Sequence, residues 1–309
     1  MTKQEFYYDS RDNKSRIHAV KWVPEKQPKG IAIIVHGMAE HMGRYEYVAG
    51  KLCDAGYVVA GNDHLGHGGS INENPKGFFC KQDPATVAVR DVHRLKKMLQ
   101  KEYPELPVFV YGHSMGSLIA RCYISKYGTG IDGVVLSGTI MLTKIKIIGM
   151  GAILAFLTFF AGSKHVSEFV NTMATGSYLK RISNPRTKFD WLSHDEVSVD
   201  EYVADDLCGF TFTLNGFRTL KDLLFRMHDR KALNMIPKNL PILMVYGSED
   251  PCGDYGVAVQ AVYDQYKTLG IEDVVCKKYE GDRHEIHNEA DKDNLMSEIC
   301  SWMDAHIEE

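Results

Sequence analysis

The sequence predicts an α/β fold organised around a mostly parallel β-sheet. Short apolar runs alternate with helix-like segments up to about residue 138, and the alternation resumes at residue 241. Several of these runs are almost wholly apolar, which is typical of strands buried on both faces. A third observation is the stretch 108–123, where β-prone residues lead into Gly112-His-Ser-Met-Gly116 and then a helix-compatible segment. This order of strand, G-x-S-x-G and helix places a serine on a tight turn above a strand end.

The first half of the chain supplies six of the expected strands. They cover residues 5–8, 16–23, 30–35, 57–62, 108–111 and 133–138. Between them, apolar residues at helical spacing predict helices over 44–55 and from Pro84 to about 104. Asp83 is the expected N-cap of the second of these helices, because Pro at the first helical position commonly follows such a cap.

The alternation stops near residue 140. From there to about 231 the sequence has helical stripes but no convincing strand, and strands resume at 241–247 and 273–279. Helical spacing marks one further helix around 259–269 and a last one around 295–302. We therefore predict one core, residues 1–140 and 232–309, with an eight-stranded sheet and helices on both faces. A helical insertion occupies residues 141–231.

Composition excludes several classes of protein. The 309 residues are 44% apolar and 25% charged with a net charge of −4, which is ordinary for a soluble protein and unfavourable for nucleic-acid binding. Seven scattered cysteines include no C-x-x-C pair, so neither a zinc site nor a disulfide framework is expected. The N-terminal residues lack the apolar run of a signal peptide. We expect a reduced, cytoplasmic protein without a metal or organic cofactor.

One apolar run, Ile147–Gly162, has no charge over 16 residues and is flanked by Lys144, Lys146 and Lys164. A membrane span needs about 20 apolar residues, so we do not expect one here. A helix resting on a core needs only one apolar stripe, and this run is apolar on more than one face. We predict that the surplus forms an exposed, lipid-facing patch. Burial in the core and packing on another subunit are the rival interpretations.

Three residues stand where serine acyl transfer needs them. Transfer through serine requires a base and a carboxylate that orients the base, and behind an elbow they follow in the order Ser, Asp, His, each after a strand. Ser114, Asp250 and His284 fit that order. Asp63 also follows a strand and is the rival acid, although it more readily stabilises the glycine-rich turn at 66–69. His287 is the rival base, but we place it in the last helix.

The same turn geometry predicts an oxyanion hole. The backbone N–H of Met115, at the helix start, is one expected donor. The second should come from the loop after the strand over 30–35, which indicates the N–H of Met38. His36-Gly37 would shape that loop. His113 should face away from the nucleophile by strand alternation, so we expect a packed structural residue.

Five motifs occur together: His36–Tyr45, Asp63–Ser70, Gly112–Gly116, Gly247–Asp250 and Gly281–His284. In combination they resemble the monoacylglycerol lipase and lysophospholipase-like α/β hydrolases, a group often labelled serine aminopeptidase-like. The resemblance covers roughly 30–140 and 235–305, whereas only 206–213 looks familiar within the insertion. It implies an α/β-hydrolase fold with a specificity-setting cap at the insertion, catalytic Ser114, Asp250 and His284, and oxyanion donors at Met38 and Met115.

The expected function is hydrolysis of carboxylic esters through an acyl-enzyme, with lipid esters of the monoacylglycerol or lysophospholipid type as substrates. Two alternatives stay open. A peptidase of the same fold is favoured if the acidic residues of the insertion line the pocket to bind a substrate amine, and these are Asp195, Glu196, Asp200, Glu201, Asp205 and Asp206. A non-catalytic ligand-binding protein is favoured only if the triad is distorted. The acyl-chain length and head group of the substrate and the oligomeric state of the protein stay open.

Overall fold

A computed structural model describes residues 1–307 of the chain and contains one eight-stranded sheet. The strand order is β1-β2-β4-β3-β5-β6-β7-β8. The bounds are β1 Thr2–Asp9, β2 Arg16–Val23, β3 Gly30–Val35, β4 Tyr57–Asn62, β5 Val108–His113, β6 Gly133–Ser137, β7 Ile242–Gly247 and β8 Val274–Tyr279. β2 is antiparallel to both neighbours, and all pairings from β4 to β8 are parallel. The predicted eight-stranded, mostly parallel sheet is confirmed, and the carboxyl ends of β3 to β8 meet at one edge.

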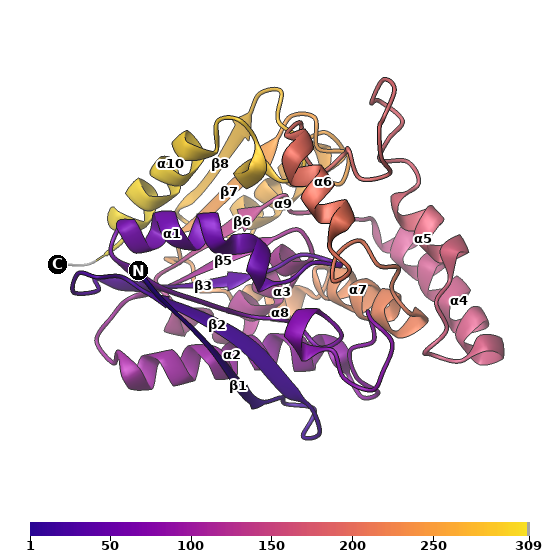
Figure 1. Cartoon of the computed structure of the whole chain (residues 1–309), viewed down its shortest axis with the longest axis horizontal. Helices are drawn as coiled ribbons and strands as arrows, with labels where there is room; N and C mark the ends of the chain where they lie inside the picture. The colour runs from indigo at the N-terminus through magenta and orange to yellow at the C-terminus, as the bar shows by residue number, and fades with distance from the viewer. Residues whose placement is uncertain (308–309) are drawn as a thin grey trace.

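Helices cover both faces of the sheet, as predicted (Figure 1). α1 (Glu46–Asp54) and α10 (Lys292–Asp304) lie on one face, and α2 (Pro84–Glu102), α3 (Met115–Tyr127) and α9 (Val257–Thr268) lie on the other. Alternate residues of each central strand enter opposite cores. Ile33 of β3 packs with the α2 and α3 side, whereas Ile34 packs with the α1 and α10 side. Burial on both faces explains why these strands read as continuous apolar runs.

The starts of α2 and α1 compare differently with the positions predicted from the sequence. Asp83 caps α2 as predicted, because its carboxylate accepts the N–H of Thr86. α1 begins at Glu46 rather than at 44 as predicted. The residues before it, Met42–Tyr45, form a separate 3₁₀ turn in which the His41 side chain accepts the N–H of Gly43. The side-chain cap at His41 thus favours a 3₁₀ turn at this point, and the α-helix begins only after it.

Five α-helices lie between β6 and β7 in the described chain. They are α4 (Lys144–Ala161), α5 (Glu168–Thr175), α6 (Glu196–Ala204), α7 (Leu214–Arg226) and α8 (Arg230–Asn234). The extended pairing found there is a single bridge between Val166 and Thr213. α7 packs on α2, α3 and α4, whereas α4 and α5 form the end of the molecule farthest from the two termini (Figure 1). The insertion is therefore helical, as the sequence predicted.

The apolar run predicted to be a patch forms most of α4. By length and composition this helix could cross a membrane, with a mean hydropathy of 1.8. Only 11% of it is buried in the fold, so it is not a core helix. Ile147 and Leu154 are its buried residues, and Phe159 is 82% exposed. The rival interpretation that the whole run packs in the core is therefore wrong.

Candidate active site

Ser114 lies on the predicted tight turn between β5 and α3, with a backbone φ of +53°. Such a conformation is rare for a residue with a side chain and is held by its surroundings. The flanking glycines are required by close approach. A Cβ at Gly112 would lie 2.7 Å from the carbonyl oxygen of Gly116, and a Cβ at Gly116 would overlap the carbonyl oxygen of Val35. The turn is therefore tight enough to present the Ser114 side chain at the strand end.

The two predicted oxyanion donors, Met38 and Met115, line the same cavity as Ser114. Met115 is the first residue of α3, so its N–H has no acceptor within the helix. Among the described residues, no hydrogen bond takes the N–H of Met38. Gly37 brings the Met38 loop against the serine, since a Cβ there would lie 3.2 Å from the Ser114 Cβ.

His36 fixes the base of this loop. Its Nε2 accepts the backbone N–H of His64 at 2.9 Å, so the proton is on Nδ1, which lies 2.8 Å from the Gly37 carbonyl oxygen and donates to it. Burial lowers the pKa of His36 well below its usual value, which keeps the ring neutral in this role. The expectation that His36-Gly37 shapes the loop agrees with these contacts.

Asp250 and His284 come from the loops after β7 and β8 and contact each other. The Asp250 Oδ2 and His284 Nδ1 atoms are 2.9 Å apart, with both side chains buried. The contact has the distance of an ion pair but not the alignment of a hydrogen bond. The other Asp250 oxygen accepts the N–H of Cys252 at 2.8 Å. Within the described residues, His284 Nε2 is buried without a hydrogen-bond partner, and it is the nitrogen left for Ser114.

The surroundings of His284 decide its pKa. Burial lowers it, but the Asp250 carboxylate, with smaller contributions from Glu285 and Glu40, more than offsets burial, so the pKa of His284 is raised above its usual value of 6.5. Aromatic rings hold the imidazole in place: its centroid is 4.8 Å from that of His113 and 5.1 Å from that of Trp191. A base oriented by a carboxylate and lining the same cavity as a half-buried serine is the arrangement of acyl transfer.

The rival residues lie elsewhere or have other contacts. Asp63 accepts the N–H groups of Met42 and Gly69, both at 2.7 Å, and therefore stabilises the glycine-rich turn. His287 is in a 3₁₀ turn before α10, and not within the last helix as predicted, because the chain turns at Ile286–Asn288 first. Its ring packs on Tyr45. His113 is buried as expected, although it also lines the cavity.

A cavity of about 320 Å³ opens over Ser114 and His284. Its floor is the core loops just described, and the insertion supplies most of its walls. The walls are largely apolar: Ile140 comes from the end of the first core segment, and Ala174, Leu179, Phe210 and Leu220 come from the insertion. A mostly apolar pocket with a few polar groups at one end is typical of small-molecule sites.

Within the described chain, the six acidic residues on which the peptidase interpretation depends do not line this cavity. Glu168 is the acidic residue of the insertion that does, and its carboxylate accepts the Thr211 hydroxyl at 2.7 Å. Asp195 caps α6, Asp200 pairs with Arg186, and Asp205 pairs with His41. The peptidase interpretation depended on these acids facing the pocket, so it loses its main support.

The described chain also contains free cysteines and groups of side chains that could bind a metal ion. The seven cysteines are free in the described chain, and Cys252 is the one that lines the cavity. Burial raises the pKa of Cys252, so it is a neutral thiol. His41, Asp205 and Cys208 lie close enough to share an ion. However, His41 Nδ1 accepts the Gly43 N–H and Nε2 contacts Asp205, so neither ring nitrogen offers a free lone pair.

Several residues of the site were not identified from the sequence. Trp191 and Tyr178 come from the insertion, where no periodic pattern marks them, and Tyr178 lies 3.5 Å from the Cys252 sulfur. Glu40, Arg44 and Glu285 form a buried ion cluster beside the loop that carries Met38, the predicted oxyanion donor. The first two are part of the motif 36–45, but their partner is 241 residues from Arg44 in the chain.

The chain is similar in sequence and in fold to known hydrolases. The model of the family described as serine aminopeptidase, S33, matches residues 26–291. A monoacylglycerol lipase of Mycolicibacterium smegmatis is 29% identical over 290 residues, which are 93% of this chain and 92% of that protein. A monoglyceride lipase of Mus musculus is 27% identical, with 93% and 86% covered. A carboxyl esterase from Bacillus coagulans, solved with glycerol, superposes over both whole chains with a TM-score of 0.92 and 31% identity. This chain therefore belongs to the serine aminopeptidase S33 family of α/β hydrolases.

Proposed function

We propose that Ser114 is the nucleophile, His284 the general base and Asp250 the carboxylate that orients it, with Met38 and Met115 as oxyanion donors. One observation carries the proposal: a strained serine turn opens into the same cavity as a buried His–Asp pair. No metal or organic cofactor has a role in this chemistry.

The proposed reaction has two steps. His284 Nε2 takes the proton of Ser114 as its oxygen attacks the ester carbonyl, and the negative charge that develops lies between the two oxyanion N–H groups. His284 then gives that proton to the departing alcohol, which leaves an acyl-enzyme. Water activated by the same histidine releases the acid. Asp250 stabilises the imidazolium in both steps.

The protein is a carboxylic ester hydrolase that acts on lipid esters, in keeping with its lipase and esterase relatives. We propose monoacylglycerols as preferred substrates over lysophospholipids, because the walls of the cavity are apolar and no basic cluster for a phosphate lines them in the described chain. We also propose that residues 141–231 act as a cap that sets this preference, since most of those walls come from the insertion.

A substrate panel tests this proposal. We expect kcat/KM to be highest for monoacylglycerols, measurable for p-nitrophenyl esters, lower for lysophospholipids and undetectable for aminoacyl-anilides. The assay is fatty-acid or chromophore release with matched acyl chains, so that only the leaving group differs. Preferential cleavage of aminoacyl-anilides would contradict the ester proposal and restore the peptidase. Preferential cleavage of lysophospholipids would keep the enzyme class and change the substrate.

We further propose that α4 contacts a lipid surface. Its exposed apolar residues include Ile145, Ile148, Phe156, Phe159 and Phe160. Exposed apolar patches of this kind mark interaction sites. Lys144, Lys146 and Lys164 flank them and are exposed, and each basic residue near an anionic surface contributes about 1 kcal/mol. A reduced, cytoplasmic location is consistent with the seven free cysteines.

Liposome co-sedimentation tests the lipid contact. The double variant Phe156→Ser/Phe159→Ser should bind anionic vesicles at least tenfold more weakly, because burying one phenylalanine contributes about 2 kcal/mol. KM for long-chain monoacylglycerol should rise while kcat for a soluble short ester is kept. Val257→Ser, which removes an equally exposed apolar side chain from α9, should change neither. Equal sedimentation of all three proteins would contradict the proposal.

A further inference from the structure

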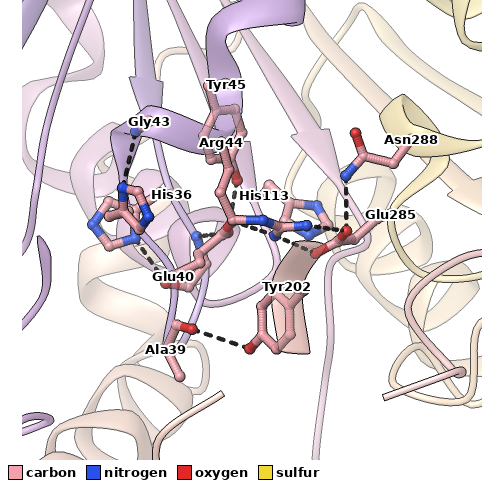
Figure 2. A network of polar contacts seen from close by, with 12 residues as sticks. His36, Ala39, Glu40, Gly43, Arg44, Tyr45, His113, Tyr202, Glu285 and Asn288 are labelled. Carbon is pink, nitrogen blue, oxygen red and sulfur yellow. Dashed lines mark hydrogen bonds and ion pairs between the residues drawn. The ribbon is translucent and has the colours of Figure 1, made fainter. Parts of the chain in front are cut away.

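A buried cluster of charges lies beside the oxyanion loop (Figure 2). The guanidinium of Arg44 binds both carboxylate oxygens of Glu285, at 2.6 and 2.8 Å, and one oxygen of Glu40 at 2.9 Å. The side chains of Glu40 and Glu285 are only 3% exposed and that of Arg44 is 11% exposed. Burial raises the pKa of Glu40, whereas the Arg44 guanidinium holds the pKa of Glu285 at about 2 against its own burial.

Glu40 connects this cluster to the oxyanion loop. Its Oε1 accepts the N–H of Gly37 at 2.5 Å and the hydroxyl of Tyr45 at 2.8 Å, while its Oε2 faces Arg44. The carboxylate therefore closes the turn from residue 37 to residue 40. Met38, whose N–H must face the substrate oxygen, lies inside that turn.

Glu285 connects the cluster to the loop of the base. It follows His284 directly, and its own N–H donates to the Leu192 carbonyl at 2.7 Å. Its carboxylate also accepts the Asn288 side-chain amide at 2.8 Å. One guanidinium thus joins the loop that carries Met38 to the loop that carries His284, which are otherwise far apart in the chain.

The insertion reaches the same loop through Ala39. This residue has a φ of +54°, a strained conformation for a residue with a Cβ. Its carbonyl accepts two hydrogen bonds, from the Tyr202 hydroxyl at 3.0 Å and from the Gly209 N–H at 2.9 Å. The Arg44 guanidinium lies over the Tyr202 ring, 4.7 Å from its centroid. Figure 2 shows Tyr202 facing both Arg44 and Ala39.

Burying these charged groups costs free energy, and a stable core does not require such groups. Burying two carboxylates and a guanidinium carries a desolvation penalty, and apolar residues of similar volume often stabilise a core as well or better. A network of fixed hydrogen bonds does, however, define one geometry. The oxyanion hole needs such a geometry, because its donors act only when they point at the place where charge develops.

We propose that Glu40, Arg44 and Glu285 are positioning residues that hold the Met38 N–H and His284 in register around Ser114. Tyr202 extends this unit to α6, so the seating of the insertion on the core also sets the direction of the Met38 N–H. This inference rests on the proposed function, because it assigns a purpose to the oxyanion loop of that site.

Glu40→Gln is the decisive variant, because the amide keeps the shape but cannot accept from Gly37 and Arg44 as a carboxylate does. We expect kcat for a soluble short ester to fall between ten- and a hundredfold, less than the roughly 10²–10³ that follows loss of an oxyanion donor. KM should change less than about twofold, since the contact strengthens in the transition state. Affinity for a trifluoromethyl ketone, which forms a tetrahedral adduct, should weaken in parallel with kcat/KM.

Two further variants separate geometry from charge. Arg44→Lys keeps the positive charge but cannot bridge both carboxylates, so it should lose kcat as Glu40→Gln does. Tyr202→Phe keeps the ring on Arg44 and removes only the bond to Ala39, so it should fold normally and lose kcat about threefold. Asp91→Asn is the control, because this buried carboxylate accepts the Ser10 hydroxyl and the backbone N–H of Arg11 and does not line the cavity. It should lower the melting temperature without changing kcat or ketone affinity.

The outcomes separate the positioning role from the proposed function. Wild-type kcat in Glu40→Gln and Arg44→Lys would overturn the positioning role. An equal loss of kcat in Asp91→Asn at a similar drop in melting temperature would also overturn it, because the loss would then follow stability alone. If Glu40→Gln does not fold, unchanged ketone affinity in Tyr202→Phe would overturn it instead. Fluorophosphonate labelling of the wild-type enzyme tests the nucleophile separately. Labelling at Ser114 that persists but slows in the variants supports the positioning role.

Discussion

Replacement of Ser114 by alanine is expected to lower ester turnover by several orders of magnitude. The residual rate should be about 10³–10⁴-fold above that in water, which is what an oxyanion hole and binding alone supply. The fold should be kept, because the turn depends on close approach at Gly112 and Gly116 and not on the serine hydroxyl. The measurement is kcat for a p-nitrophenyl ester together with the melting temperature.

The matched control is Ser125→Ala in the same helix, α3. The Ser125 hydroxyl donates to the Cys122 carbonyl and does not line the cavity, so this variant should keep wild-type turnover. A fluorophosphonate probe should label the wild type and the control at Ser114, as shown by peptide mapping, and should not label Ser114→Ala. Full activity of the alanine variant, or labelling of another serine, would remove the nucleophile from this assignment.

The sheet could be predicted closely because its central strands are buried on both faces. β3 is apolar from end to end, and β4 is buried throughout and ends at Asn62, the first strongly polar residue after its apolar run, so the limits of both strands coincide with the limits of the apolar runs. β1 is different: it pairs only with β2 and is mostly exposed, and it extends from Thr2 to Asp9 where residues 5–8 were predicted. Because much of an edge strand faces water, its sequence need not be apolar throughout, and no apolar run then marks where the strand begins and ends.

The candidate triad could be predicted because each member follows a strand in a fixed order, which is a local property of the sequence. The contacts that hold it could not. Arg44 and Glu285 pair across 241 residues, and Ala39 takes a strained conformation that no residue-type preference favours. Such features depend on how loops meet after the sheet has formed. Much of the cavity wall comes from the irregular segment between α5 and α6, which includes Trp191, and a segment without helix or strand carries no periodic pattern that could mark its buried residues.

Asp250→Asn is expected to lower kcat by roughly 10⁴, because an amide at this position favours the wrong tautomer of the base. The pH profile should change as well. In the wild type the acid limb of kcat/KM should have its midpoint above pH 6.5, since His284 must be neutral to act and its pKa is raised. Without the Asp250 charge, the pKa of His284 loses the contribution that raises it most, so the acid limb of the residual activity should move to lower pH.

Asp63→Asn is the matched comparison, a second buried aspartate that follows a strand. Asp63 holds the N–H groups of Met42 and Gly69 and contacts His18 at 2.8 Å, so its loss should lower the free energy of unfolding by about 1.5–3 kcal/mol. Soluble Asp63→Asn should keep kcat within a fewfold of wild type, with the acid limb unmoved. Urea unfolding and stopped-flow ester hydrolysis measure the two properties separately. If Asp63→Asn instead lost 10⁴ in kcat while Asp250→Asn lost only stability, Asp63 would be the carboxylate that orients the base.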